Sequence, residues 1–172
     1  NQPMSRPIAI FGLPEEQFID KVFSIRQKLL EEKKLEETEA ATLPHLTLLV
    51  NTALDDLVSN EFLIQRIKPL ISVLKQFTLA VTGFEKLDTS VIAKFDTSFS
   101  RKLVAQMSSV LPGFRPITTD FIKILRRTVP ASTNEALEVV NTEFPNGINI
   151  DRICIASGNL RREDIIWTGK LS

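Results

Sequence analysis

The stretch LPHLTLLV, residues 43–50, contains the single histidine of the 172-residue chain, His45, with Thr47 two positions after it. An imidazole titrates near neutral pH, so His45 is a candidate acid or base. A histidine among apolar residues is also often a packed core residue, which is the alternative interpretation. Any functional role of Thr47 depends on that of His45, because threonine is common in strands.

A second unusual side chain is Lys123, in the apolar stretch DFIKILRR, residues 120–127. In an inner strand its ammonium must reach water, an acid or an anion, because burying an unpaired charge is costly. In an edge strand it would only discourage aggregation. Phe121 lies on the same face of the strand as Lys123 and either packs in the core or stacks on a base. Arg126 and Arg127 either bind phosphate or form a solvated strand end.

Other catalytic constellations are missing from the sequence. One histidine and one cysteine, Cys154, do not make a zinc site. The chain has no Walker loop, no Gly-x-Ser-x-Gly elbow and no cysteine–histidine pair at a telling spacing. We therefore expect no metal and no cofactor. Cys154 lies in the apolar run RICIAS, which predicts a buried thiol.

The amino-acid composition limits the classes of partner that the protein could bind. The 21 basic and 21 acidic side chains cancel, so no long-range positive field attracts duplex DNA or long RNA. A nucleic-acid partner would be a small nucleotide or a chain end. No apolar run approaches the roughly 20 residues that cross a bilayer, and no signal peptide opens the chain. We therefore expect a soluble cytoplasmic protein that binds no membrane.

Strands and helices alternate along the chain and must position these side chains. Apolar spacing predicts four helices, at residues 14–32, 60–76, 98–111 and 132–144. We expect Pro14 at the first position of the first helix, a kink or break at Pro69, and serine caps at the third and fourth helices. Residues 31–42 are expected to be a frayed helix end and a solvated loop. Period-two patterns predict strands at residues 6–12, 43–50, 77–83, 90–96, 120–127, 150–157 and 165–171.

The order of these elements repeats. Each half of the chain begins with a strand, a helix and a strand, and then adds a helix and a further strand. Hairpin patterns at 77–96 and 150–171, and the lack of a Gly-rich loop after Phe11, argue against a doubly wound parallel sheet. We expect a single α+β domain, residues 1–172, in which two antiparallel sheets face a central cleft with helices outside. Its pseudo-twofold lobes would be roughly residues 1–85 and 86–172.

Five stretches carry a resemblance to a known family: IAIFGLPEE, Pro44-His45-Leu46-Thr47, FTLAVTGFEKL, LPGF, and the closing RICIASGNLRREDIIWTGKLS. In this order they resemble the 2H phosphoesterase superfamily, which contains bacterial 2′,5′ RNA ligase-like proteins and cyclic nucleotide phosphodiesterases. The likeness covers nearly the whole chain.

The resemblance implies two His-x-Thr or His-x-Ser strands, whose imidazoles transfer protons while the hydroxyls hold phosphate. His45 and Thr47 match the first strand. At the second, Phe121 and Lys123 replace the histidine and the hydroxyl, and Arg126 matches an arginine that often follows the motif. An alternative register puts Ile117 and Thr119 at these positions. We prefer Phe121 and Lys123, which share one face of the better strand.

On this resemblance, a lone His45 covers only one of two proton transfers, so we expect impaired catalysis. The expected ligand is a small nucleotide or an RNA end with a 2′,3′-cyclic or 2′,5′ phosphate. Lys123 and Arg126 would bind the phosphate, Phe121 would stack on a base, and the protein would be a monomer. Two alternatives stay open: an active phosphodiesterase that uses Lys123 in place of the second histidine, and a non-catalytic protein-interaction module.

Overall fold

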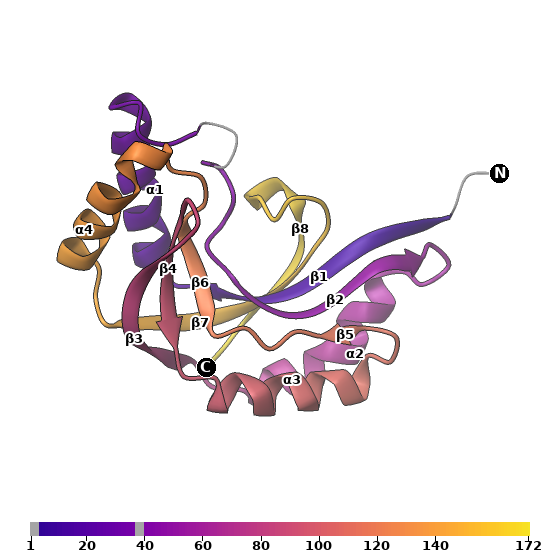
Figure 1. Ribbon diagram of the computed structural model, residues 1–172. Helices are drawn as coiled ribbons and strands as arrows, with labels where there is room; N and C mark the ends of the chain where they lie inside the picture. The colour runs from indigo at the N-terminus through magenta and orange to yellow at the C-terminus, as the bar shows by residue number, and fades with distance from the viewer. Residues whose placement is uncertain (1–3, 37–39) are drawn as a thin grey trace.

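A computed structural model of the chain describes residues 4–36 and 40–172. The described residues form eight strands and four α-helices, with an α-helix after β1, β2, β4 and β6 (Figure 1). The strands are β1 Ser5–Pro14, β2 Leu46–Asp55, β3 Phe77–Leu87, β4 Ser90–Phe95, β5 Arg115–Pro116, β6 Phe121–Leu125, β7 Gly147–Ala156 and β8 Ile165–Lys170. The helices are α1 Glu16–Glu31, α2 Asn60–Val73, α3 Ser98–Val110 and α4 Thr133–Glu143, with short 3-10 turns η2 Pro130–Ser132 and η3 Arg162–Asp164.

All eight strands belong to one curled antiparallel sheet, with the order β5-β2-β1-β7-β3-β4-β6. β8 also pairs with β7, beside the segment of β7 that pairs with β1. Helix α1 lies beside α4 near one end of the sheet, and α2 lies beside α3 near the other (Figure 1). The α+β class and the hairpins β3–β4 and β7–β8 are therefore confirmed.

The expectation of two facing sheets is wrong, because β3 is long enough to serve both halves. Residues 77–80 of β3 pair with β7, and residues 81–87 pair with β4. A register shift between Val81 and Gly83 lies near the change of partner. Since one strand continues from one pairing to the other, the two halves join edge to edge instead of stacking face to face.

Several helix ends differ from the sequence expectations. Pro14 is the last residue of β1, where it pairs with Ile150, and α1 begins two residues later. Pro69 lies inside α2, which continues through it as one helix. At α3 the N-cap residue is Thr97, which makes no side-chain cap hydrogen bond, and the Asp96 carboxylate accepts the Ser98 amide at 2.7 Å. Ser132, expected to cap α4, makes no side-chain cap hydrogen bond.

The segment that follows α1 is not wholly solvated. Leu35 is buried and forms an isolated bridge with Thr128. The Glu36 amide donates to the Arg127 carbonyl at 2.8 Å. Residues 37–39 of this segment lie outside the described residues. The expected loop is therefore tied, through its first part, to the chain just after β6.

A smaller apolar cluster contains Phe11, Leu13, Ile19, Leu43, Cys154 and Ala156. The main core is a larger apolar cluster between the sheet and the helices, and it includes residues from both halves of the chain. Strand residues enter it at alternate positions, for example Leu46 and Leu48 of β2 and Ile122 and Ile124 of β6. This alternation fixes which strand face is buried. None of the described helices combines the length and the apolar character that a membrane span requires.

Candidate functional site

The buried alternation on β2 and β6 determines where the predicted site residues point. Leu46 and Leu48, and Ile122 and Ile124, are in the core on the helix side. Residues one position away must face the opposite side of the sheet, because successive side chains in a strand alternate. His45, Thr47, Phe121 and Lys123 therefore lie on that opposite side, each partly exposed.

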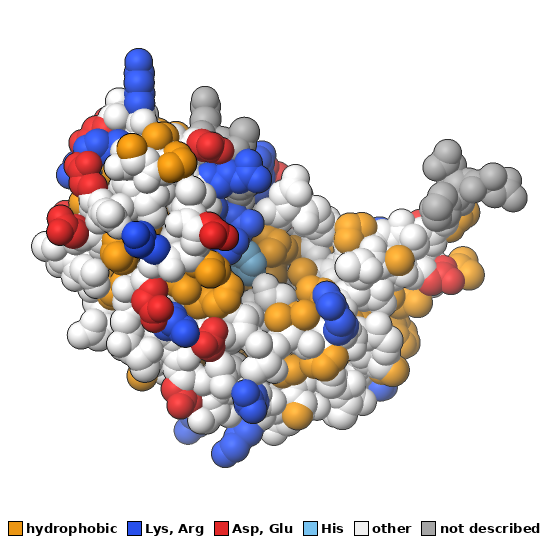
Figure 2. All heavy atoms as spheres, in the orientation of Figure 1, with side chains coloured by type: hydrophobic (Ala, Val, Ile, Leu, Met, Phe, Trp, Pro, Cys, Tyr) orange, Lys and Arg blue, Asp and Glu red, His pale blue; other side chains and the backbone are white. Residues whose placement is uncertain are grey.

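A cavity of about 330 Å³ gathers these side chains. His45, Thr47, Phe121, Lys123 and Arg126 all line it. The remaining lining residues are Val50, Arg115, Ile117 and Thr119. Figure 2 shows the histidine at the bottom of a hollow, next to basic and hydrophobic side chains. The structure thus brings the predicted site residues together, and their roles stay predictions.

Both registers considered for the second motif reach this cavity, but only one lies in a strand. Phe121 and Lys123 are in β6. Thr119 precedes the strand, and its hydroxyl donates to the Phe121 carbonyl at 2.9 Å and accepts the Phe121 amide at 3.2 Å. The Thr119 hydroxyl is thus engaged with the turn, and the assignment of Phe121 and Lys123 as the counterparts of His45 and Thr47 stays a prediction.

The protonation of His45 follows from its contacts. Its Nδ1 lies 2.7 Å from the Leu43 carbonyl oxygen. A carbonyl only accepts hydrogen bonds, so Nδ1 carries the proton and Nε2 is the free acceptor of the neutral ring. The pKa of His45 is lowered to about 4, and burial is the largest cause. The Leu43 hydrogen bond raises the pKa, and the nearby charges of Arg126, Arg26 and Lys123 contribute to its lowering. His45 is therefore neutral at pH 7.

The charged side chains in the described lining of the cavity are all basic. Its basic side chains are Arg115, Lys123 and Arg126, and none of the described residues that line it is acidic. In a chain of zero net charge, a positive potential at this place comes from these local side chains and not from a global field. The backbone at Arg126 is held in place, because the Ser90 hydroxyl donates to the Arg126 carbonyl at 2.6 Å. The arrangement suits an anion.

Arg127 does not share this site. Its side chain is exposed and forms an ion pair with Glu36 at 3.7 Å. Cys154 is fully buried, and burial raises the pKa of its thiol, so the thiol is protonated at neutral pH. Trp167 is partly buried and packs against the core.

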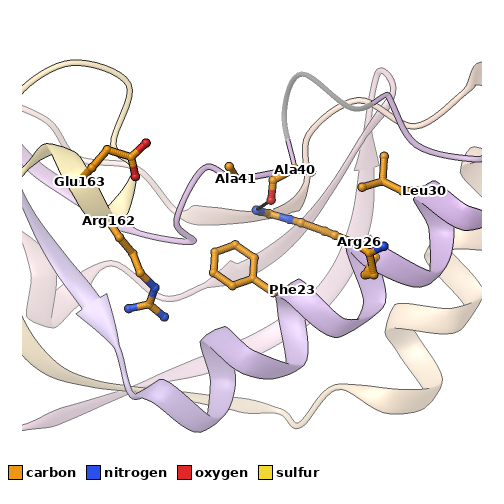
Figure 3. A pocket seen from close by; sticks show the side chains of 8 residues that line it. Phe23, Arg26, Leu30, Ala40, Ala41, Arg162 and Glu163 are labelled. Carbon is orange, nitrogen blue, oxygen red and sulfur yellow. Dashed lines mark hydrogen bonds between the residues drawn. The ribbon is translucent and has the colours of Figure 1, made fainter.

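Arg26 is a supporting residue that the sequence interpretation missed. It is 2% exposed, and its guanidinium donates to the carbonyls of Ile124 at 2.9 Å, Ala40 at 3.1 Å and Thr42. Figure 3 shows it extending from α1 toward Ala40, with Phe23 beside it. These bonds join α1, β6 and the chain before His45. The sequence feature that could have identified Arg26 is its spacing from Val22 and Leu29, which places it on the core face of the helix.

A separate cavity of about 370 Å³ lies beside Arg26, between α1 and the residues of η3 (Figure 3). Its walls include Phe23, Leu30, Arg162 and Glu163. None of the site residues expected from the sequence lines it. It is therefore distinct from the His45 cavity.

Among the described residues, the sheet and the helices define a class of fold: a curled antiparallel half-barrel with four helices. No family model and no curated protein matches the sequence. Solved structures do match. Escherichia coli LigT complexed with 3′-AMP superposes with a TM-score of 0.58 at 14% identity, over 98% of this chain and 99% of that chain.

The structure of a second protein also superposes on this chain over nearly its full length. TT0787 of Thermus thermophilus matches with a TM-score of 0.57 at 13% identity, over 96% of this chain and 97% of that chain. LigT in apo form matches with a TM-score of 0.55. The chain has the LigT fold over nearly its full length, which confirms the resemblance to the 2H phosphoesterases at the level of the fold.

Proposed function

We propose that the protein binds a phosphorylated nucleotide or an RNA end in the His45 cavity and hydrolyses 2′,3′-cyclic or 2′,5′-linked phosphates poorly or not at all. The observation that carries this proposal is a single cavity that gathers His45, Thr47, Lys123 and Arg126, with no acidic residue among its described lining. The shared fold adds support, because LigT has been crystallised with 3′-AMP, with phosphate and with ATP.

The residues that line the cavity could contact both the phosphate and the base of such a ligand. Lys123 and Arg126 supply positive charge and hydrogen-bond donors for phosphate oxygens. The Thr47 hydroxyl adds a neutral donor. Phe121 and Ile117 supply an apolar surface against which a base can stack.

The proposed weakness of catalysis follows from the proton transfers that the cleavage requires. Neutral His45 can accept one proton at Nε2. Its low pKa, about 4, makes it a weak base. Opposite it stand a phenyl ring and an ammonium instead of a second imidazole. Missing one acid–base catalyst costs about 3–5 kcal/mol of barrier, from the usual 10²–10⁴-fold contribution.

An active phosphodiesterase is the second candidate. Lys123 lines the same cavity as His45, and in this candidate its ammonium would donate a proton to a leaving oxygen. The two candidates share the ligand and differ in turnover. A rate of cyclic phosphate hydrolysis typical of ordinary enzymes, lost in Lys123→Met, would establish the active form.

Calorimetric titration tests the binding proposal. Adenosine 2′,3′-cyclic phosphate and 3′-AMP should bind wild type, and adenosine should bind much more weakly. Lys123→Met should weaken phosphate binding by about 1–3 kcal/mol, the range for a hydrogen bond to a charged group. Lys86→Met, at an exposed position of β3, is the matched control and should change nothing. If no phosphate ligand binds wild type at millimolar concentration, the cavity is not a nucleotide site, and the remaining interpretation is a protein-interaction module.

A further inference from the structure

The loop between β7 and β8 lies beside His45, although the two are far apart in the sequence. Residues 158–161 of this loop line a cavity of about 400 Å³ together with His45 and Thr42. The Leu160 carbonyl accepts the Leu43 amide at 3.0 Å, and the carbonyl of Leu43 itself accepts the Nδ1 proton of His45 at 2.7 Å. Leu43 therefore connects the loop directly to the imidazole.

Pro44 makes this connection stiff. It lies between Leu43 and His45, and its ring fixes its own φ and restricts the backbone of the residue before it. A movement of Leu43 is therefore passed on to its carbonyl oxygen and to the backbone of His45. The position of the Leu160 carbonyl thus affects where the acceptor of the Nδ1 proton lies.

The backbone of Leu160 is held in an unfavourable conformation. Its φ is 57°, in the left-handed region that a residue with a Cβ adopts only at a cost. Such a conformation persists where the surroundings hold it. One oxygen of the Asp164 carboxylate, Oδ2, accepts the amides on both sides of Leu160, from Asn159 at 3.2 Å and from Arg161 at 3.1 Å. The carboxylate therefore fixes the loop around Leu160.

Apolar packing gives the loop a second connection to the imidazole. Leu160 packs against the smaller apolar cluster, which contains Phe11 and Leu43. Phe11 in turn contacts the ring of His45. The loop therefore supports His45 through a hydrogen-bonded path and through an apolar one.

We propose that Asp164 is a positioning residue for His45. Through the loop and Leu43, its carboxylate keeps the imidazole in the tautomer with the proton on Nδ1, which leaves Nε2 as the acceptor. The hydrogen bond that one ring nitrogen makes decides which nitrogen carries the proton, so the place of the Leu43 carbonyl sets the tautomer. The use of Nε2 as a base rests on the proposed function, whereas the tautomer is a property of the protein without ligand.

Heteronuclear NMR of the imidazole nitrogens tests this proposal, because the chain has a single histidine. Wild type at neutral pH should show the tautomer protonated on Nδ1. In Asp164→Ala the loop loses the acceptor of two amides and admits water to the ring. The tautomer protonated on Nε2 should then become populated, and the pKa of His45 should rise from about 4 toward 6.5. The basic side chains around His45 are the same in both proteins: Arg26, Arg115, Lys123, Arg126 and Arg161.

Three further variants separate the charge of the carboxylate from its hydrogen bonds. Asp164→Asn keeps an oxygen that can accept both amides, so it should retain the wild-type tautomer and pKa of His45. Glu163→Ala removes the carboxylate of the exposed neighbouring residue and should change neither. Gly158→Ala keeps Asp164 but displaces its carboxylate, because the new Cβ would lie 3.0 Å from Oδ1 and the φ of Gly158 is 67°. It should shift the tautomer in the same direction as Asp164→Ala, and it replaces that variant if Asp164→Ala does not fold.

The positioning role is refuted if the two disruptive variants, Asp164→Ala and Gly158→Ala, are folded by thermal unfolding and keep the wild-type tautomer and pKa of His45. If Asp164→Asn behaves like Asp164→Ala, the charge of the carboxylate acts on the ring and the hydrogen-bonded path is overturned. Calorimetric titration with 3′-AMP tests the proposed function separately. If 3′-AMP does not bind wild type while the tautomer responds to the variants, the nucleotide site is refuted and the positioning role stands. If 3′-AMP binds and the tautomer does not respond, the reverse holds.

Discussion

The ring of His45 meets the ring of Phe11 edge-on, with centroids 5.7 Å apart and planes at 71°. Phe11 is fully buried on β1, so this contact places one side of the imidazole against apolar surface. His45 therefore contacts an apolar ring and also lines the cavity that contains Lys123 and Arg126. Burial of the imidazole is the largest cause of its low pKa, about 4.

The first prediction concerns stability and pH. The pKa of His45 is about 6.5 in the unfolded chain and about 4 in the folded protein, so the unfolded state binds more protons between these values. The contribution of His45 to stability is fully present above pH 6.5 and is lost as the pH falls toward 4. We expect His45→Gln to flatten the pH dependence of the free energy of unfolding in this window, by about 1–3 kcal/mol.

Urea unfolding of wild type and His45→Gln at pH values from 4 to 7.5 measures this difference. Carboxylates also titrate below pH 5, so the relevant quantity is wild type minus variant at each pH. Parallel curves for the two proteins would show that His45 does not titrate abnormally.

The second prediction is that ligand binding is coupled to proton uptake by His45. A bound phosphate adds negative charge beside His45 and favours imidazolium, so the pKa of His45 should rise on binding. Binding should therefore take up a proton at pH 5.5, where the ring of the free protein is largely neutral. Calorimetry in two buffers of different ionisation enthalpy measures the uptake. His45→Gln should abolish it while keeping part of the affinity, and equal uptake in the variant would assign the proton to another group.

The third prediction restores the missing half of the site. Wild type should hydrolyse adenosine 2′,3′-cyclic phosphate slowly. The double variant Phe121→His, Lys123→Thr should raise the rate by up to about 10²–10⁴-fold, because a second imidazole then takes the other proton transfer. The control adds His45→Gln to the double variant, which should remove the gain. A gain that survives His45→Gln would mean that the two strands do not act as a pair.

The fourth prediction concerns Arg26. Its guanidinium satisfies three backbone carbonyls around the chain that leads to His45. Arg26→Leu should destabilise the fold by about 2–5 kcal/mol, because the carbonyls lose their donors inside the protein. Arg26→Lys should recover only part of this, since one ammonium cannot reproduce the planar fork. Gln27→Leu, at the exposed neighbouring position, should stay within about 0.5 kcal/mol in the same urea titration.

The strand side of the site could be predicted from sequence because the period of two leaves little choice. Once Leu46, Leu48, Ile122 and Ile124 are buried, the side chains between them must face the cavity. The join between the two halves of the sheet could not be predicted in this way. Local pattern shows that β3 is a strand but does not say that its two ends pair with different neighbours.

Arg26 and Arg161 show a different limit of prediction from sequence. Arg26 could have been found from its place on the apolar face of α1, because a charged side chain there needs a specific set of partners. Arg161 lies in the polar run GNLRRED, which has the composition of any solvated turn. The position of this turn depends on contacts of Leu160 and Asp164, which hold it against the strand of His45. These contacts are tertiary, so local sequence does not show them.

The position of β7 has a consequence for how the protein folds. β7 pairs with β1, β3 and β8, and the Ala9–Ala156 pair joins residues from opposite ends of the described chain. Such pairings give a high relative contact order, because a large loop must close before they contribute any stability. We expect folding on the millisecond-to-second scale of non-local β topologies. We expect the loop between β7 and β8 to take its place only after β7 has joined the sheet, so the surroundings of His45 should be among the last parts of the molecule to form.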